Sequence, residues 1–176
     1  KKVNKLSQVK TQKLLNDLPM YLKGIGRTLE SMPGKKAIFV ILDSDDADCA
    51  ELKKDLVEMY EKSGVTVDVY FCIAIEEMEA WLLGDEKAIE EAYPQAKMPL
   101  LRKYVQDSIV GTWEYLADVV YSGGVNALKK KAESYYEIGL FKCECAGNIG
   151  MYLNIHENKS PSFNYFINKL NDFCEV

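Results

Sequence analysis

Six consecutive apolar residues at positions 37–42 lead directly into the segment DSDDAD at positions 43–48. The apolar run follows the turn signal Pro33-Gly34, and its length and continuity predict a β-strand that is covered on both faces. We therefore expect a central strand of a sheet. Four aspartates at its end are more than a surface turn needs, so this segment either begins a solvated helix or holds a cation.

The residues after this strand predict a second strand in the same sheet. A helix is expected from Asp45 or Asp48 to about Lys62, with Gly64 in the position that commonly ends a helix. A strand then follows at 67–75, where alternate residues are apolar. A strand, a helix and a strand of these lengths form a βαβ unit with parallel strands and a right-handed crossover. The fold class is therefore α/β, a parallel sheet flanked by helices.

The second strand also ends in acidic residues, in the segment IEEMEAW. Because the carboxyl ends of parallel strands meet at one sheet edge, Asp43 and Asp45 should lie near Glu77 or Glu79. Like charges held this close raise one another's pKa values unless a cation neutralises them. Carboxylates without histidine or cysteine favour Mg²⁺ or Mn²⁺. The alternative is helix capping, which accounts for two of the four aspartates.

The remaining segments predict helices. The first covers about residues 8–31, and Pro19, two residues after Asp17, stands where a second helix could start. The apolar face expected for it contains Leu14, Leu18, Tyr21, Ile25 and Leu29. The part from residue 96 onward is expected to be mostly helical, with Gly123-Gly124 as a turn between helices.

The last helix is expected to start at Ser160-Pro161, a cap followed by a first-turn proline. Its apolar stripe is formed by Phe163, Phe166, Ile167, Leu170 and Phe173. Near its start, Asn158, Ser160 and Ser162 could face the acidic edge, although a helix start packed on the sheet explains them more simply.

Composition narrows the classes of function. The chain has 176 residues, 48% of them hydrophobic, which suits one compact unit, and it contains neither a signal-peptide pattern nor a membrane-spanning run. The five cysteines have no disulfide or zinc spacing, so we expect reduced thiols in a cytoplasmic protein. Acidic residues outnumber basic ones by 27 to 22, which argues against tight binding to nucleic acid without a partner. The single histidine, His156, is interpreted as a loop residue.

Three segments carry a family resemblance: LDSDDADCAELK, IEEMEAWLLGD and NKSPSFNYFINKL. In order and spacing they resemble the blocks of the bacterial family called domain of unknown function 4276. That family is similar to the TOPRIM fold, a Mg²⁺-binding α/β module of topoisomerases, primases and nucleases of the overcoming-lysogenisation-defect type. The resemblance implies a TOPRIM-like core over residues 1–95 and a helical part, 96–176, packed on it.

The resemblance also assigns residues. The TOPRIM aspartate motif falls on Asp43 and Asp45, with Asp46 or Asp48 as additions, and the second acidic block falls on Glu77 and Glu79. These assignments imply four catalytic residues, Asp43, Asp45, Glu77 and Glu79, and five metal ligands, the same four with Asp46. TOPRIM modules also use a glutamate on an earlier strand. No glutamate precedes Glu30 here, so that strand either lies upstream of Lys1 or has been lost.

The leading hypothesis is a Mg²⁺-dependent nuclease that acts in phage defence with an ABC-like ATPase and contacts DNA through that partner. The rival is a non-catalytic metal-binding or protein-interaction module with a degenerate TOPRIM fold. A third, weaker idea is phosphoryl transfer on a nucleotide. We expect no membrane partner, and the sequence is compatible with a homo-oligomer.

Overall fold

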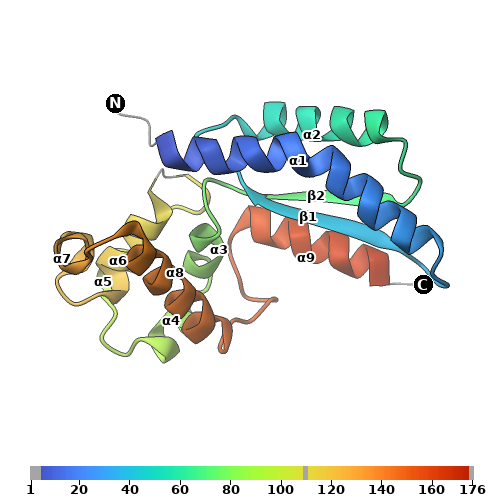
Figure 1. Ribbon diagram of the computed structural model, residues 1–176. Helices are drawn as coiled ribbons and strands as arrows, with labels where there is room; N and C mark the ends of the chain where they lie inside the picture. Colours follow the sequence, from blue (N-terminus) through green and yellow to red (C-terminus); the bar gives the residue numbers. More distant parts are fainter. Residues whose placement is uncertain (1–4, 109–110, 175–176) are drawn as a thin grey trace.

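The computed structural model describes residues 5–108 and 111–174, which adopt a mixed α/β fold (Figure 1). Two strands form a sheet with α1 and α2 on one face and α9 on the other, and the helices α3 to α8 lie beyond its carboxyl end. The elements are α1 Lys5–Glu30, β1 Ala37–Asp43, α2 Cys49–Ser63, β2 Asp68–Ala74, α3 Glu79–Leu83, α4 Glu86–Ala92, α5 Met98–Leu101, α6 Thr112–Val120, α7 Gly124–Lys131, α8 Tyr135–Gly150 and α9 Pro161–Cys174.

The two strands are parallel, as the βαβ pattern predicts, and their register runs from Ala37 opposite Asp68 to Asp43 opposite Ala74. The expectation of a central strand is wrong for the part of the chain that the structure describes, because β1 pairs there with β2 alone. The apolar run of β1 has another cause. Helices cover both faces of the sheet, so most residues on both sides of the strand are at least partly removed from water, although Ile41 stays 41% exposed.

The helix between the strands begins and ends where the sequence places it. Asp48 is its N-cap, and its carboxylate accepts hydrogen bonds from the backbone N–H groups of Ala50 and Glu51, at 2.9 and 3.0 Å. Gly64 ends it with φ 70°, a left-handed conformation that glycine adopts without steric cost. One of the four aspartates is therefore a capping residue.

The first helix differs from its prediction in two ways. It is continuous through Pro19, so no second helix starts there. Among its side chains from residue 13 onward, which the structure describes, the buried ones are Leu18 and Leu22, whereas Tyr21 and Ile25, expected on the buried face, are 47% and 46% exposed. The helix presents Gly26 to the loop after α2, where a Cβ on Gly26 would stand 2.8 Å from a Val65 methyl group. This close approach fixes which face turns inward.

The helices beyond the sheet enclose their own apolar core. Its fully buried side chains include Leu83, Ile89, Leu116 and Ile149. Between α6 and α7 the chain turns at Gly123 and Gly124, as predicted, both with positive φ. In the described residues, no helix combines the length and hydropathy needed to cross a membrane.

The last helix returns to the sheet and connects it with the other helices. Trp81 of α3 stacks on Phe166 of α9, with ring centroids 5.4 Å apart, and Phe39 of β1 contacts Phe166 and Phe173 edge to face. The aromatic residues of the predicted stripe therefore pack on the sheet. The domain boundary at 95/96 stays a prediction.

Candidate functional site

The carboxyl ends of the two strands are tied together by backbone hydrogen bonds. Ser44 N–H donates to the Ala74 carbonyl and Asp45 N–H to the Glu76 carbonyl, each at 2.9 Å. The buried Ser44 hydroxyl accepts a bond of 2.7 Å from Glu76 N–H. Asp45 and Glu76 both have positive φ, 47° and 65°, which is unusual for residues other than glycine. The chain therefore turns sharply after each of the two strands, within the acidic segments.

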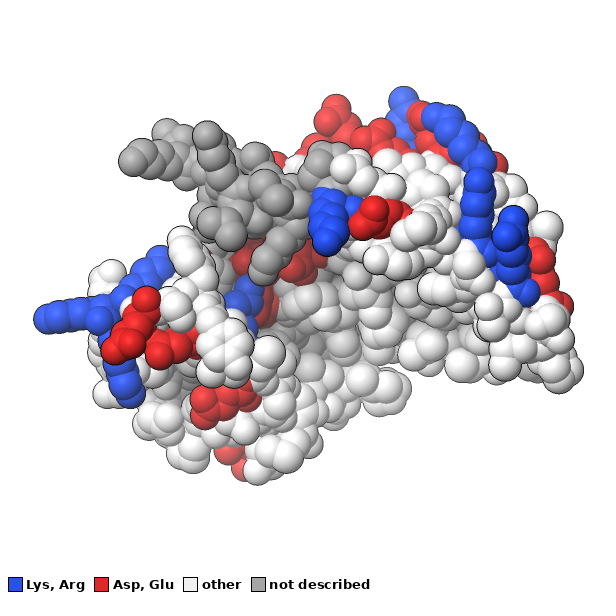
Figure 2. All heavy atoms as spheres, viewed as in Figure 1, with Lys and Arg blue, Asp and Glu red and all other residues white. Residues whose placement is uncertain are grey.

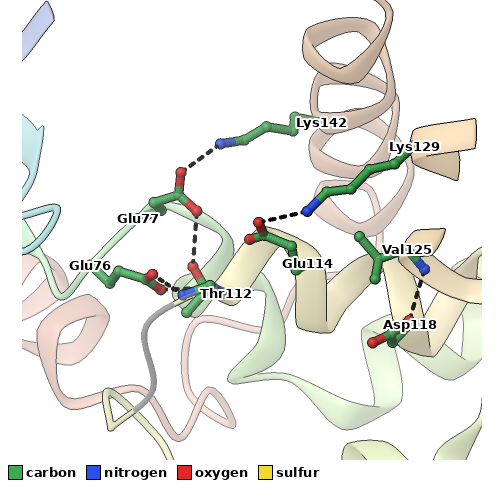
Figure 3. Close-up of polar contacts among 9 residues, drawn as sticks. Glu76, Glu77, Thr112, Glu114, Asp118, Val125, Lys129 and Lys142 are labelled. Atoms are coloured by element: carbon green, nitrogen blue, oxygen red, sulfur yellow. Dashed lines mark hydrogen bonds and ion pairs between the residues drawn. The ribbon is translucent and has the colours of Figure 1, made fainter. Parts of the chain in front are cut away.

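Glu76 has a structural role. Its carboxylate accepts hydrogen bonds from the backbone N–H groups of Gly111 and Thr112, the latter at 2.7 Å, at the start of α6 (Figure 3). The side chain is buried, and burial raises its pKa while these hydrogen bonds oppose the rise. A carboxylate at a helix N-terminus also complements the helix dipole. Glu76 therefore fixes α6 against the strand end.

Lys142 of α8 stands between the next two glutamates. Its ammonium lies 3.1 Å from Glu77 Oε1 and 3.2 Å from Glu79 Oε2, and Figure 3 shows the side chain reaching from α8 toward Glu77. Burial alone lowers the pKa of Lys142, but Glu79 and Glu77 raise it above its ordinary value. Glu77 also accepts a hydrogen bond of 3.4 Å from the Thr112 hydroxyl.

Two carboxyl groups of this region hold their protons unusually tightly. Burial raises the pKa of Asp43 to about 6. The charge of Lys142 opposes this rise, and the charges of Glu77 and Asp45 add to it. The pKa of Glu79 is raised to about 7, again by burial and against Lys142. Such mutual effects require short distances between the groups. We call Asp43, Asp45, Glu77, Glu79 and Lys142 the acidic cluster.

The acidic cluster contains polar atoms with incomplete partners. Asp43 accepts a hydrogen bond from the Met78 backbone, but its Oδ1 atom is buried and finds no hydrogen-bond partner among the described residues. Glu79 Oε2 has the Lys142 ammonium at 3.2 Å as an ion pair, without a hydrogen bond of good geometry. Figure 2 shows acidic side chains set back in a hollow between the sheet and the helices. Two carboxylates, Glu77 and Glu79, thus pair with one ammonium, whose charge also acts on Asp43.

The donor chemistry of the acidic cluster fits a hard cation. In residues 5–108 and 111–174, no group of three or more histidine, cysteine, aspartate or glutamate side chains is arranged to hold a metal ion. Mg²⁺, however, commonly takes one or two carboxylates and completes its coordination with water. Asp43, with its unpartnered buried oxygen, and the neighbouring Glu77 and Glu79 offer carboxylate oxygens of this kind.

The other residues singled out from sequence lie elsewhere. Asp46 is exposed in the turn after β1, Asp48 caps α2, and His156 is exposed in a loop. Sequence reasoning missed Lys142, the single basic residue of α8, and Thr112, which contacts both Glu76 and Glu77. The one available signal was a single lysine in a helix that has no other basic residue.

Asn158, Ser160 and Ser162 do not face the acidic cluster but form a separate buried network with Asp107 and Trp81. Ser160 Oγ and Ser162 N–H donate to the Asp107 carboxylate at 3.0 and 2.8 Å. Trp81 Nε1 donates to Ser162 Oγ at 2.9 Å, and Asn158 Nδ2 donates to the Trp81 carbonyl at 2.7 Å. We call these five residues the Asp107 network. It holds the start of α9 against α3.

A comparison with protein families matches the model described as Domain of unknown function (DUF4276) over residues 1–171. The chain belongs to this family. A comparison with curated proteins found no match, and a comparison with solved structures found none either. The predicted family is therefore confirmed for this DUF4276 protein, whereas its similarity to TOPRIM modules stays a prediction.

Proposed function

We propose that this DUF4276 protein is a Mg²⁺-dependent, TOPRIM-like nuclease that hydrolyses phosphodiester bonds. The observation that carries the proposal is the acidic cluster itself. It brings together two buried carboxyl groups, those of Asp43 and Glu79, with pKa values of about 6 and 7, near the carboxyl ends of the parallel strands. Ligands of open α/β sheets bind at this edge, and strongly perturbed carboxyl groups gather at functional sites.

Each residue of the acidic cluster has a role in this proposal. Asp43 together with Glu77 or Glu79 would hold the cation, and Asp45 adds negative charge beside Asp43. A bound Mg²⁺ or Mn²⁺ supplies positive charge that lowers the pKa of water and neutralises a phosphate.

Lys142 supplies the positive charge that balances the carboxylates of the acidic cluster. Its ammonium neutralises Glu77 and Glu79 in the absence of a divalent ion, at 3.1 and 3.2 Å. When a cation replaces it there, the ammonium becomes available to contact a phosphate oxygen. The side chain is 28% exposed, so it can reach a substrate without leaving α8.

DNA contact is proposed to come from a partner. The chain carries more acidic than basic residues, 27 to 22, and a basic run of Lys129, Lys130 and Lys131 at the end of α7 is too small for tight binding. The family resemblance points to an ABC-like ATPase as the partner and to phage defence as the setting. Asp46 remains a proposed further metal ligand.

The direct test is Mn²⁺ binding by titration calorimetry, with wild type compared with Asp43→Asn and with the control Asp55→Asn on the exposed face of α2. We expect wild type and Asp55→Asn to bind alike and Asp43→Asn to bind at least about tenfold more weakly, because a charged ligand is lost. Plasmid nicking in Mn²⁺ should follow the same order. Wild type that binds no metal at millimolar concentration would overturn the proposal.

One observation favours the rival, a non-catalytic module: Lys142 already pairs with two of the carboxylates. The variant Lys142→Met distinguishes the nuclease from the non-catalytic module. If the ammonium competes with a cation, this variant should bind Mn²⁺ more tightly than wild type and lose nicking activity, whereas Lys129→Met on α7 should change neither. Lower stability with unchanged metal binding would instead support a structural ion pair and the non-catalytic module.

A further inference from the structure

A groove of about 270 Å³ borders strand β2. Residues of three elements line it: Cys49 and Lys53 of α2, Phe71 and Ile73 of β2, and Ser162 and Tyr165 of α9. The helices α2 and α9 cover opposite faces of the sheet, and no described residue of β1 lines the groove (Figure 1). The groove therefore lies along the outer edge of β2, the edge that faces away from β1.

The main chain of Phe71 and Ile73 points into this groove. Successive residues of a strand direct their N–H and C=O groups to opposite edges. The Ala74 carbonyl points to β1, because it accepts a hydrogen bond of 2.9 Å from Ser44 N–H. The main-chain groups of Cys72 and Ala74 therefore point to β1, and those of Phe71 and Ile73 point to the outer edge.

These outward main-chain groups are covered but unpaired. Phe71 and Ile73 are only 5% and 6% exposed. Within the described part of the chain, β2 pairs with β1 alone, and no loop or side chain forms a hydrogen bond with the main chain of Phe71 or Ile73. Buried N–H and C=O groups are almost always paired in folded proteins. We therefore expect the outer edge of β2 to have a partner outside this chain.

An extended polypeptide supplies the groups that this edge lacks. Phe71 and Ile73 stand two residues apart, about 6.6 Å along the strand, and an added strand presents its own N–H and C=O groups at the same repeat. The groove is smaller than the roughly 300–1,000 Å³ of typical small-molecule sites. We propose that the outer edge of β2 binds an extended peptide segment of a partner protein by strand addition, with one apolar side chain of the peptide in the groove.

Lys53 gives this peptide a preferred charge. Its ammonium lies 3.0 Å from the Tyr165 hydroxyl, from α2 to α9, and forms no ion pair within the described chain. The carboxylate that lines the groove, Asp107, already accepts hydrogen bonds from Ser160 and Ser162. A second copy of this edge would bring another ammonium that has no carboxylate, whereas an acidic residue in the peptide would neutralise Lys53. The peptide therefore carries an acidic residue beside its apolar one.

The contact between Lys53 and Tyr165 opens when the peptide binds. Tyr165 is 36% exposed and Lys53 is partly exposed, so both side chains can move without disturbing the core. Lysine side chains also protect sheet edges against unwanted pairing, which is the alternative role for Lys53. Peptide binding at this edge needs no metal, and its outcome is independent of the proposed nuclease activity.

The first test selects short linear peptides from a random phage-display library on the immobilised full chain. We expect enriched peptides to have alternate apolar residues next to an acidic one. A synthetic copy should bind wild type and Ala50→Phe alike and Cys49→Phe at least about tenfold more weakly, because the larger side chain fills the groove. Ala50 is exposed on the same turn of α2. The absence of any enriched peptide, or binding that survives Cys49→Phe, would overturn the proposal.

The second test needs no variant of the protein. Hydrogen exchange of the full chain is followed by NMR with and without the selected peptide. Strand addition predicts that the peptide slows exchange of the Phe71 and Ile73 amides at least about tenfold and leaves the Cys72 and Ala74 amides unchanged. A peptide that is N-methylated at its central amides should lose this protection. Equal protection of all four amides would show binding without strand addition and would contradict the proposal.

The third test concerns the charge preference and the identity of the occupant. Lys53→Met should bind the acidic peptide about three- to fivefold more weakly, and Lys54→Met, exposed on the same helix, should bind it like wild type. Tighter binding by Lys53→Met would show that Lys53 protects the edge. Sedimentation equilibrium tests the remaining occupant: wild-type dimers that disappear in Cys49→Phe would mean that a second copy fills this edge, and would overturn the assignment to a partner peptide.

Discussion

The acidic cluster and the Asp107 network are both largely buried and polar, and both connect segments that lie far apart in the chain, yet they differ in hydrogen bonding. In the Asp107 network each carboxylate oxygen, hydroxyl and indole N–H has a partner at normal distance. In the acidic cluster Asp43 Oδ1 has no hydrogen-bond partner among the described residues, and the pKa of Glu79 is raised to about 7 by burial.

This difference in hydrogen bonding distinguishes buried polar groups that stabilise the fold from buried polar groups that do not. A buried polar group that is fully hydrogen-bonded stabilises one arrangement of the chain. Buried like charges with incomplete partners lower stability, and they persist where a function requires them. The Asp107 network is explained by the fold alone. The acidic cluster is not, and this is why the proposed function rests on it.

The largest expected effect is on the Asp107 network. Asn158→Ala removes the bond from Nδ2 to the Trp81 carbonyl, 2.7 Å, and the bond that Oδ1 accepts from Ser160 N–H, 2.9 Å. Two buried backbone groups then lose their partners, so we expect the free energy of unfolding to fall by about 3 kcal/mol. Urea denaturation measures the change, and Asn168→Ala, exposed on α9, is the control. If the free energy of unfolding falls no more in Asn158→Ala than in that control, the Asp107 network does not stabilise the fold, and its contrast with the acidic cluster is lost.

The second prediction concerns pH. Because burial raises the pKa of Glu79 from 4.5 to about 7, the folded state binds its proton more tightly than the unfolded state does. Its contribution to stability is complete below pH 4.5 and is lost as the pH rises through 7. In the absence of metal, Glu79→Gln should therefore gain stability relative to wild type between pH 4.5 and 8, by up to about 3 kcal/mol.

Thermal unfolding of both proteins at several pH values measures this gain, with Glu91→Gln on the exposed face of α4 as the control. Parallel stability curves for wild type and Glu79→Gln would show that Glu79 has an ordinary pKa. The acidic cluster would then resemble the Asp107 network.

The features that the sequence predicted correctly depend on contacts between near neighbours in the chain. The cap at Asp48 and the helix end at Gly64 are each set by hydrogen bonds or backbone conformations within a few residues, and the strand at 37–42 is indicated by an unbroken apolar run. Ser160-Pro161 is a similar case, because Ser160 Oγ accepts a bond from Phe163 N–H at 3.2 Å. Local chemistry is sufficient for such features.

The features that the sequence missed depend on packing between distant segments. Lys142 stands 65 positions after Glu77, and nothing local indicates that α8 turns it toward the strand ends. Tyr21 was placed on the wrong face of α1 because two faces have suitable spacing and the contact of Gly26 with Val65 decides between them. Glu76 and Glu77 are consecutive, and the positive φ of Glu76 sends one to α6 and the other to Lys142.

The smallest expected effect lies at Thr112, the residue between the structural Glu76 and the acidic cluster. Its hydroxyl lies 3.4 Å from Glu77 Oε2, a long hydrogen bond, and its backbone N–H donates to Glu76 at 2.7 Å. Thr112→Val removes the hydroxyl and keeps the N–H, so α6 should remain capped while stability falls by about 1 kcal/mol. Thr28→Val on the exposed face of α1 is the control.

The Mn²⁺ affinity of Thr112→Val shows whether the Thr112 hydroxyl belongs to the acidic cluster. We expect it to be unchanged in Thr112→Val, because the 3.1 Å ion pair with Lys142 positions Glu77 more strongly than the long hydroxyl bond does. An affinity that fell with Thr112→Val but not with Thr28→Val would show that the hydroxyl orients Glu77. Thr112 would then serve both regions: its backbone N–H would bind the structural Glu76 at the start of α6, and its hydroxyl would belong to the acidic cluster.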